Sequence, residues 1–282
     1  LNLTSSDESV SIFNISNLLF TFISSCKKHI FEERETKKMR HYTSAEWKKL
    51  NKIQILIVGV VFVALSSFIG LGTYFANHSV LIDGTQDKVM WGQLTFYYTQ
   101  ILYSPMLAIF IAISLTQEFE RKNLEMLCSN AISIKKLLIS KLLTVTVLVI
   151  PIQLLILIVY IIALEVADVE LSSFVLLTLK WTLLSILSSL SILCIQAFVY
   201  AKTRSFGQSI GISAIGAMGG FVLLFLNENL NKFYPYSQPM VALRSRALDD
   251  FSLLELTIFV FVNLLFSVIF YRLTCYELEK RG

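Results

Sequence analysis

Residues 142–164 read LLTVTVLVIPIQLLILIVYIIAL, a stretch without a single charged side chain. A helix of about 20 apolar residues is long enough to cross a hydrocarbon layer about 30 Å thick. A helix also satisfies its own backbone hydrogen bonds, which lipid cannot do. This stretch therefore predicts a transmembrane helix.

Five further stretches have the same character and comparable lengths: 53–76, 93–117, 174–200, 210–226 and 256–273. Lys180 lies inside 174–200, and Arg272 lies at the end of 256–273. The chain is 55% hydrophobic and 16% charged, whereas about 25% of residues in soluble domains are charged. A soluble core has no room for so many long apolar helices. The sequence therefore predicts an all-α membrane protein, a bundle of six transmembrane helices.

The basic residues are sorted by position along the chain. Most of the 24 Lys and Arg residues fall within 27–52, 118–141, 202–204 and 272–281. If every apolar stretch crosses the bilayer, these segments share one side, and an excess of Lys and Arg marks the cytosolic side. Both termini are therefore predicted to be cytosolic. Lys180 would lie near the outer edge, where it either snorkels to the interface or pairs with an outer acid, or else has a functional role.

Composition and motifs exclude several functional classes. The net charge of +4 is too small to indicate nucleic-acid binding. The chain has no Gly-x-x-x-x-Gly-Lys-Ser/Thr loop with which to bind ATP by itself, and no His-Glu-x-x-His or Gly-x-Ser-x-Gly motif of a hydrolase. The cysteines and histidines are too scattered for a metal site or a disulfide framework: Cys26, Cys128, Cys194, Cys275, His29, His41 and His78. We expect a non-catalytic membrane subunit without metal or cofactor.

The segment 118–141, between the second and third apolar stretches, is the most informative part of the chain. Its first half places Phe119, Leu124 and Leu127 among charged residues, and its second half places apolar residues from Ile134 onward at helical spacing up to Lys141. This pattern is typical of short amphipathic helices presented to a cytosolic partner. The alternative is a solvated connector that only returns the chain to the membrane.

The order of residues in this segment resembles a known family. Glu118 closes the second span, Glu120-Arg121 and Leu124-x-x-Leu127 follow, and Ile134 precedes Lys141 by seven positions at the start of the third span. This pattern is similar to the type-2 permeases of ATP-binding cassette (ABC) exporters, and most closely to the permease subunits of lantibiotic and bacteriocin immunity exporters. The run FYPYSQP at 233–239 also resembles their outer loop. The resemblance covers residues 39–282; it departs from many relatives at Lys122-Asn123, where they have Gly-Thr, and at Ala131, where they have Pro.

The resemblance implies that different subunits carry out transport and ATP hydrolysis at a bacterial cytoplasmic membrane. A separate cytosolic ABC ATPase dimer would hydrolyse ATP and contact the coupling segment at Glu118, Glu120, Arg121, Leu124 and Leu127. A second copy of the chain or a sister permease would complete the transporter. The expected cargo is an amphipathic peptide or a related hydrophobic compound, expelled for self-protection. The alternative function is a membrane sensor or scaffold that acts with a partner but transports nothing.

Small and polar residues within the spans predict how the helices pack. Gly207 with Gly211 and Gly216 with Gly220 have Gly-x-x-x-Gly spacing, which lets helices approach closely, either inside one subunit or at a dimer seam. Polar residues inside the spans either line a path or bond between helices: Gln100, Gln153, Ser188, Gln196 and Asn263. Before the last span, Pro239 is expected to start a short helix that returns into the bilayer.

Residues 1–38 form a poorly defined N-terminal extension, distinct from the permease domain at 39–282. Residues 12–23 are apolar but interrupted by Asn and Ser, so they predict neither a span nor a signal peptide. We hypothesise that Met39 is the natural start, which mass spectrometry of the native N-terminus would test. After Met39, Thr43 and Glu46 have the spacing of a capping box, and Trp47 and Leu50 form an apolar edge suited to the headgroup layer.

Overall fold

The computed structural model of the protein describes residues 39–77, 81–82, 84–119, 126, 133–170 and 174–280. Residues 1–38 lie outside this range. The described residues form helices and no strand, and six helical units are long and apolar enough to cross a membrane. These units are α2 (Lys52–Asn77), α3 to α4 (Gln86–Phe119), α6 (Ile134–Val166), α7 (Phe174–Thr203), α8 (Phe206–Leu226) and α11 (Leu253–Glu279). The predicted bundle of six helices is confirmed.

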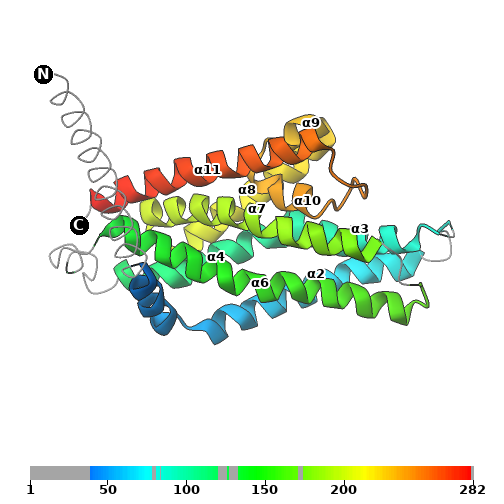
Figure 1. Ribbon diagram of the computed structural model, residues 1–282, viewed down its shortest axis with the longest axis horizontal. Helices are drawn as coiled ribbons and strands as arrows, with labels where there is room; N and C mark the ends of the chain where they lie inside the picture. The colour runs from blue at the N-terminus through cyan, green and yellow to red at the C-terminus, as the bar shows by residue number, and fades with distance from the viewer. Residues whose placement is uncertain are drawn as a thin grey trace, which may run out of the picture.

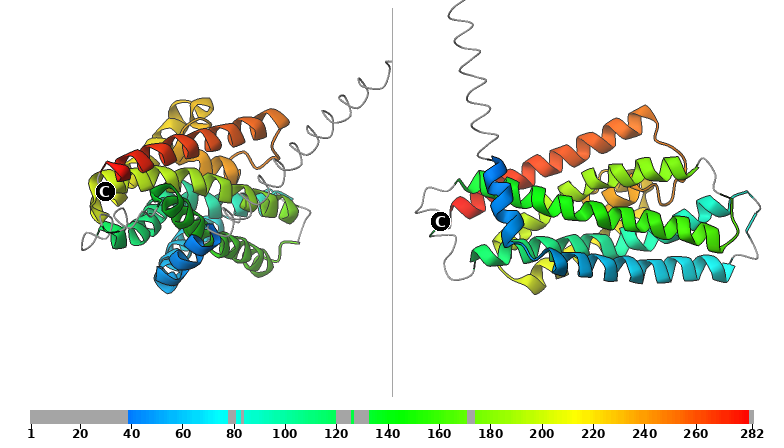
Figure 2. Two further views of the ribbon diagram at one scale, coloured as in Figure 1. Left: turned by 60° about the vertical axis from the view of Figure 1, so that its left-hand side comes forward. Right: turned by 60° about the horizontal axis from the view of Figure 1, so that its bottom comes forward.

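The long helices lie side by side along the longest axis of the molecule (Figure 1). A short helix over residues 39–49 and the end of α11 lie at one end, which we name the inner end because the sequence places it in the cytosol. The segment that precedes α11 lies toward the opposite, outer end. Figure 2 shows that helix 39–49 runs across the ends of the long helices and not along them.

The second spanning unit changes its winding partway. It consists of α3 (Gln86–Tyr97), a π-helical turn over Tyr98–Leu102 and α4 (Tyr103–Phe119). Pro105 follows the π turn in the first turn of α4, and proline removes a backbone donor from the ladder of the preceding turn. A π turn takes up such a local mismatch within a helix. It directs Tyr98 and Tyr103 into the bundle, where both are fully buried.

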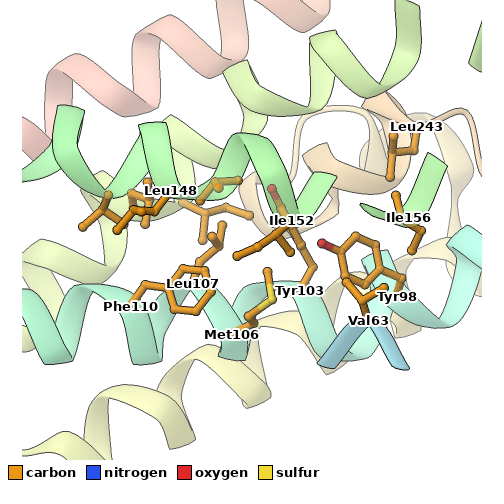
Figure 3. Packing of buried hydrophobic residues seen from close by; sticks show 14 of the residues in the cluster. Val63, Tyr98, Tyr103, Met106, Leu107, Phe110, Leu148, Ile152, Ile156 and Leu243 are labelled. Carbon is orange, nitrogen blue, oxygen red and sulfur yellow. The ribbon is translucent and has the colours of Figure 1, made fainter. Parts of the chain in front are cut away.

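The core lies between the second spanning unit, α6 and α7. Figure 3 shows Tyr98, Tyr103 and Leu107 facing Ile152 and Leu148 of α6. α7 contacts α4, α6, α8 and α11, so it occupies the middle of the bundle. In contrast, α2, α8 and α11 expose long apolar faces that include Phe68, Ile215 and Phe261. Apolar surface of this extent is expected to face lipid.

The segment before α11 folds back into the bundle. It contains α9 (Glu228–Asn231), a 3₁₀ turn (Pro235–Ser237) and α10 (Gln238–Ala242), with Pro239 in the first turn of α10. Met240 and Leu243 are buried, and the indole Nε1 of Trp91 donates a hydrogen bond to the Leu243 carbonyl oxygen at 2.8 Å. The short helix predicted at Pro239 is therefore present and lies among the spanning helices.

Most of the polar residues singled out within the spans bond between segments. Gln153 Nε2 donates to the Tyr103 hydroxyl at 2.5 Å, Gln196 Nε2 donates to the Tyr236 hydroxyl at 2.9 Å, and Gln100 Nε2 contacts Met240 Sδ. Asn263 Nδ2 donates to Gln238 Oε1 at 2.9 Å. Ser188 differs because it bonds to a carbonyl of its own helix, that of Ser185. The bonds of Gln100, Gln196 and Asn263 join α10 and the turn before it to the bundle, whereas the bond of Gln153 joins α6 to α4.

Candidate functional site

Four charged side chains meet at the inner end of the bundle, and we name them the inner charge cluster: Glu46, Lys49, Glu118 and Lys141. Lys141 Nζ lies 2.6 Å from Glu46 Oε2 and 2.9 Å from Glu118 Oε1. Lys49 Nζ lies 2.8 Å from Glu118 Oε1 and 3.7 Å from Glu46 Oε1. Each cation therefore contacts both carboxylates, and the cluster has no net charge.

Three separate segments supply these side chains. Glu46 and Lys49 lie one turn apart on helix 39–49, Glu118 is the second-last residue of α4, and Lys141 lies two turns into α6. Lys141 Nζ also donates a hydrogen bond to the Ser114 carbonyl oxygen at 3.0 Å. The cluster consequently holds helix 39–49 against the inner ends of α4 and α6, in the crosswise position seen in Figure 2.

The cluster is almost closed to solvent. The side chains of Glu118 and Lys141 are each 2% exposed and that of Glu46 is 7% exposed, whereas Lys49 is 40% exposed. Partial burial acts to lower the pKa of Lys49, but its hydrogen bond to Glu118 and the charges of Glu118 and Glu46 outweigh burial and raise it. Removing one member of such a buried pair leaves a charge without compensation, which typically costs about 3–5 kcal/mol.

A second set of contacts holds the end of α4 on its other side. The ring of Phe119 lies 5.8 Å from the ring of Tyr200 and 5.5 Å from the Arg204 guanidinium carbon. Phe119 also packs against a small apolar cluster formed by Ile134, Ala201 and Leu278. The start and the end of the segment 118–141 are thus joined to each other and to α7 and α11, so displacement of this segment would act on several spans together.

Only part of the predicted coupling segment can be placed. Glu118 lies in the inner charge cluster, while Glu120, Arg121, Leu124 and Leu127 lie outside the described residues. Glu118 is buried behind Lys49 and Lys141. We therefore assign it to holding the segment in place.

Sequence reasoning missed Glu46 and Lys49 as members of the site. The capping box predicted for Thr43 and Glu46 is wrong, because the helix already begins by residue 39 and Thr43 Oγ1 donates to the Met39 carbonyl oxygen at 3.0 Å. Glu46 instead pairs with Lys141, which is distant in sequence. The available signal was an acidic and a basic residue one turn apart on helix 39–49.

The two glycine pairs of α8 have different surroundings. A Cβ built at Gly216 would lie 2.7 Å from the Tyr236 ring, and one at Gly220 would lie 2.5 Å from Ser237 Oγ. This pair therefore allows the 3₁₀ turn to pack closely on α8 within one chain. A Cβ at Gly207 or Gly211 would have no neighbour within 4 Å among the described residues, so this pair stays available to a neighbouring chain.

The alternative of a functional role for Lys180 is not needed to explain its position. Its Nζ donates to both carboxylate oxygens of Asp250 at 2.8 Å, and both side chains are more than 40% exposed. The hydrogen bond from Lys180 lowers the pKa of Asp250, with a smaller effect from the Phe251 backbone N–H. The predicted pairing with an outer acid is confirmed.

Comparison with protein families gives a match over much of the chain. The family described as ABC-2 family transporter protein matches residues 43–220, which is more than half of the chain. The matched region includes the whole inner charge cluster and the first four spanning units. No match was found among curated proteins or solved structures. The chain therefore belongs to the ABC-2 transporter family, as a multi-pass permease subunit of an ABC transporter.

Proposed function

We propose that this permease expels amphipathic peptides, or related hydrophobic compounds, from a bacterial cytoplasmic membrane, and so protects the cell against lantibiotics or bacteriocins. A cytosolic ATPase dimer would dock on the segment 118–141. The observation that carries the proposal is the inner charge cluster, because it joins both ends of that segment and ties them to helix 39–49.

The proposed mechanism uses this connection to transmit force. Closure of the ATPase dimer on ATP would displace the docked segment. Since Glu118 and Lys141 bind one another and Phe119 packs on α7, the displacement would reach α4, α6 and α7 as one body. The nucleotide state would thereby shift the population between inward-facing and outward-facing arrangements of the spans. Met126, within the docking segment, is 55% exposed, which suits contact with a partner.

An amphipathic cargo fits the outer end of the described chain. A cavity of about 450 Å³ opens between α2, α3 and the segment 245–248. Its lining combines the aromatic rings of Phe96 and Tyr97 with the polar groups of Gln93, Ser245 and Arg246. A ligand with one apolar and one polar face would find partners for both in such a cavity.

A second permease, either another copy or a sister chain, would complete the transporter. Gly207 and Gly211 support this assignment, because they leave space on α8 for the close approach of another helix. Exposed apolar residues on the same helix, among them Ile212 and Ile215, would be covered by that contact or by lipid.

The competing function is a sensor or scaffold that moves nothing. We would coexpress the permease with its ATPase and measure ATP turnover and peptide tolerance for Glu118→Gln. A matched control is Glu279→Gln, because Glu279 also lies at the inner end but is 48% exposed and pairs only loosely with Lys135 at 3.8 Å. For an exporter, Glu118→Gln lowers both activities and the control changes neither. If Glu118→Gln leaves both at the wild-type level, the exporter assignment is wrong.

A further inference from the structure

A basic recess at the outer end lies apart from the inner charge cluster and beside the larger cavity described above, with which it shares Arg246. It is a cavity of about 40 Å³ lined by Asn231, Lys232, Met240, Val241, Arg244, Arg246 and Ala247. This volume holds a group the size of a few water molecules. Lys232 directly follows α9, and Arg244 and Arg246 lie in the turns that follow α10.

The recess continues into an apolar groove. The groove has a volume of about 230 Å³ and is lined by Asn229, Lys232, Phe233, Val241, Arg244, Leu254, Glu255, Ile258 and Phe259. Lys232, Val241 and Arg244 line both spaces, so the two are adjacent. Together they form a site with a charged end and an apolar end.

Two polar groups in the recess have no partner among the described residues. Asn231 is fully buried, and its Oδ1 accepts a hydrogen bond from Ser237 while its Nδ2 makes none. Arg246 is exposed and makes no hydrogen bond or ion pair with described residues. A buried amide donor without a partner costs free energy, typically about 1–3 kcal/mol, unless a ligand or water supplies an acceptor.

The charge balance favours an anionic acceptor. Lys232 Nζ lies 3.2 Å from Glu255 Oε1, and Arg244 lies 3.3 Å from Glu255 Oε2, so one carboxylate serves two cations. Arg246 adds a third positive charge, and Glu255 is the only carboxylate among the residues that line the two spaces. The pair of spaces thus has an excess of positive charge that Glu255 does not neutralise.

The surroundings favour a lipid as the carrier of that anion. Phe233 and Leu254 line the groove, Leu230 and Leu253 are close to them in the sequence, and all four are more than half exposed. Side chains of this kind beside Lys and Arg are typical of the boundary between acyl chains and head groups. A segment of one acyl chain fits the groove, and the phosphate of the same lipid would reach the recess.

We propose that this site holds one anionic phospholipid of the outer leaflet, with its phosphate between Asn231 Nδ2, Lys232 and Arg246 and one acyl chain along Phe233, Leu254 and Ile258. The site involves α9, α10 and α11, and it does not rest on the exporter function, although Arg246 also lines the cavity proposed for the cargo. Its occupancy is measured on the permease alone, without nucleotide or peptide. A failure here would therefore leave the proposed function untouched.

The test titrates the purified full-length permease with phosphatidylglycerol or phosphatidylcholine of equal chain length and counts bound lipids by native mass spectrometry. The wild type is expected to retain one phosphatidylglycerol in preference to phosphatidylcholine. Arg246→Gln removes a charge-assisted hydrogen bond and should reduce that preference about tenfold. Lys88→Gln is the matched control, because Lys88 also lies at the outer end but lines neither space.

The apolar half is tested separately. Ile258→Trp fills the groove and should lower retention of phosphatidylglycerol, whereas Phe261→Trp places the same side chain one turn further along α11, at an exposed position outside the groove. Glycerol phosphate at the same concentration should not displace the lipid, because it lacks the tail.

Three results would overturn the proposal. These are equal retention of the two lipids by the wild type, equal retention by Ile258→Trp and Phe261→Trp, and displacement of the lipid by glycerol phosphate alone. If the site retains an amphipathic peptide and no lipid, the assignment of a lipid is also wrong.

Discussion

Lys141 Nζ lies 2.9 Å from Glu118 Oε1, although the two residues stand at opposite ends of the segment that links the second and third spans. Both side chains are 2% exposed. The pair therefore joins the two ends of the predicted docking segment at a position that is almost inaccessible to water. Any movement of one end of this segment is passed to the other, which is the physical basis of the coupling mechanism proposed above.

Lys141→Gln should destabilise the protein strongly. The substitution leaves the carboxylates of Glu46 and Glu118 buried with only Lys49 to compensate them, at a cost of about 3–5 kcal/mol. Thermal unfolding of the purified protein in detergent measures the effect. Lys135→Gln is the control, because Lys135 is 66% exposed and should contribute less than about 1 kcal/mol. Equal effects of the two substitutions would show that the cluster has no special role.

The inner charge cluster also predicts that two substitutions within it have non-additive effects on stability. Lys141→Gln combined with Glu118→Gln removes one positive and one negative charge, so the double variant should be more stable than the sum of the single effects predicts. Coupling between contacting residues is typically about 0.5–3 kcal/mol. A double-mutant cycle on unfolding midpoints measures it, and a coupling energy of zero would contradict the direct ion pair.

Gly216→Ala should destabilise the fold, whereas Gly72→Ala should not. The added methyl group at Gly216 would lie 2.7 Å from the Tyr236 ring, which must move and weaken its hydrogen bond from Gln196. Such overpacking costs about 1–3 kcal/mol. At Gly72 no described atom lies within 4 Å, so the higher helix propensity of Ala should stabilise α2 by up to about 1 kcal/mol. If the unfolding midpoints of Gly216→Ala and Gly72→Ala move in the same direction, the packing described for α8 is wrong.

Gly211→Leu tests whether the open face of α8 is a dimer seam. If another permease packs there, a larger side chain should shift the protein from dimer to monomer in nanodiscs, as judged by mass photometry. Gly72→Leu provides the same change on α2 at a position that is also open. An unchanged dimer fraction in Gly211→Leu would place the seam elsewhere.

The ion pair between Lys180 and Asp250 predicts a small stabilisation that depends on pH. Because the folded-state pKa of Asp250 is lowered below its ordinary value of 3.8, the pair stabilises the fold at pH values above about 4. This contribution is lost as pH falls through the lowered pKa, where the carboxylate becomes protonated.

The stabilisation by the Lys180–Asp250 pair is measured as the difference in unfolding midpoint between the wild type and Asp250→Asn. Since both side chains are exposed, we expect less than about 1 kcal/mol and a further decrease in high salt. Asp249→Asn is the control, because no ion pair joins Asp249 to a described residue. A difference between wild type and Asp250→Asn that does not decrease as the pH is lowered through the acid range would contradict this origin.

Labelling of single cysteines tests the orientation in the membrane. In a background with the native cysteines replaced, a cysteine at 126 should react with a membrane-impermeant reagent only after cells are opened. A cysteine at 253 should react in intact cells, because Leu253 is 83% exposed at the outer start of α11. Reaction at 126 in intact cells would reverse the predicted topology and remove the docking site from the ATPase.

Much of this protein is determined by its sequence alone. Long uncharged stretches and the distribution of Lys and Arg are local properties of the chain, and the bilayer acts on each of them separately. They predict the six spans and their expected orientation without knowledge of any contact between helices. The order of residues from Glu118 to Lys141 likewise indicated the family before any geometry was considered.

The tertiary structure decided which charges and small residues meet. Nothing in the local sequence pairs Glu46 with Lys141 or sets Gly216 against Tyr236, because these contacts depend on how helices far apart in the chain pack together. The same is true of Asn231 and Arg246, which become a candidate lipid site only when the chain before α11 folds back into the bundle. Burial gives these residues their energetic weight, and burial is a property of the packed bundle.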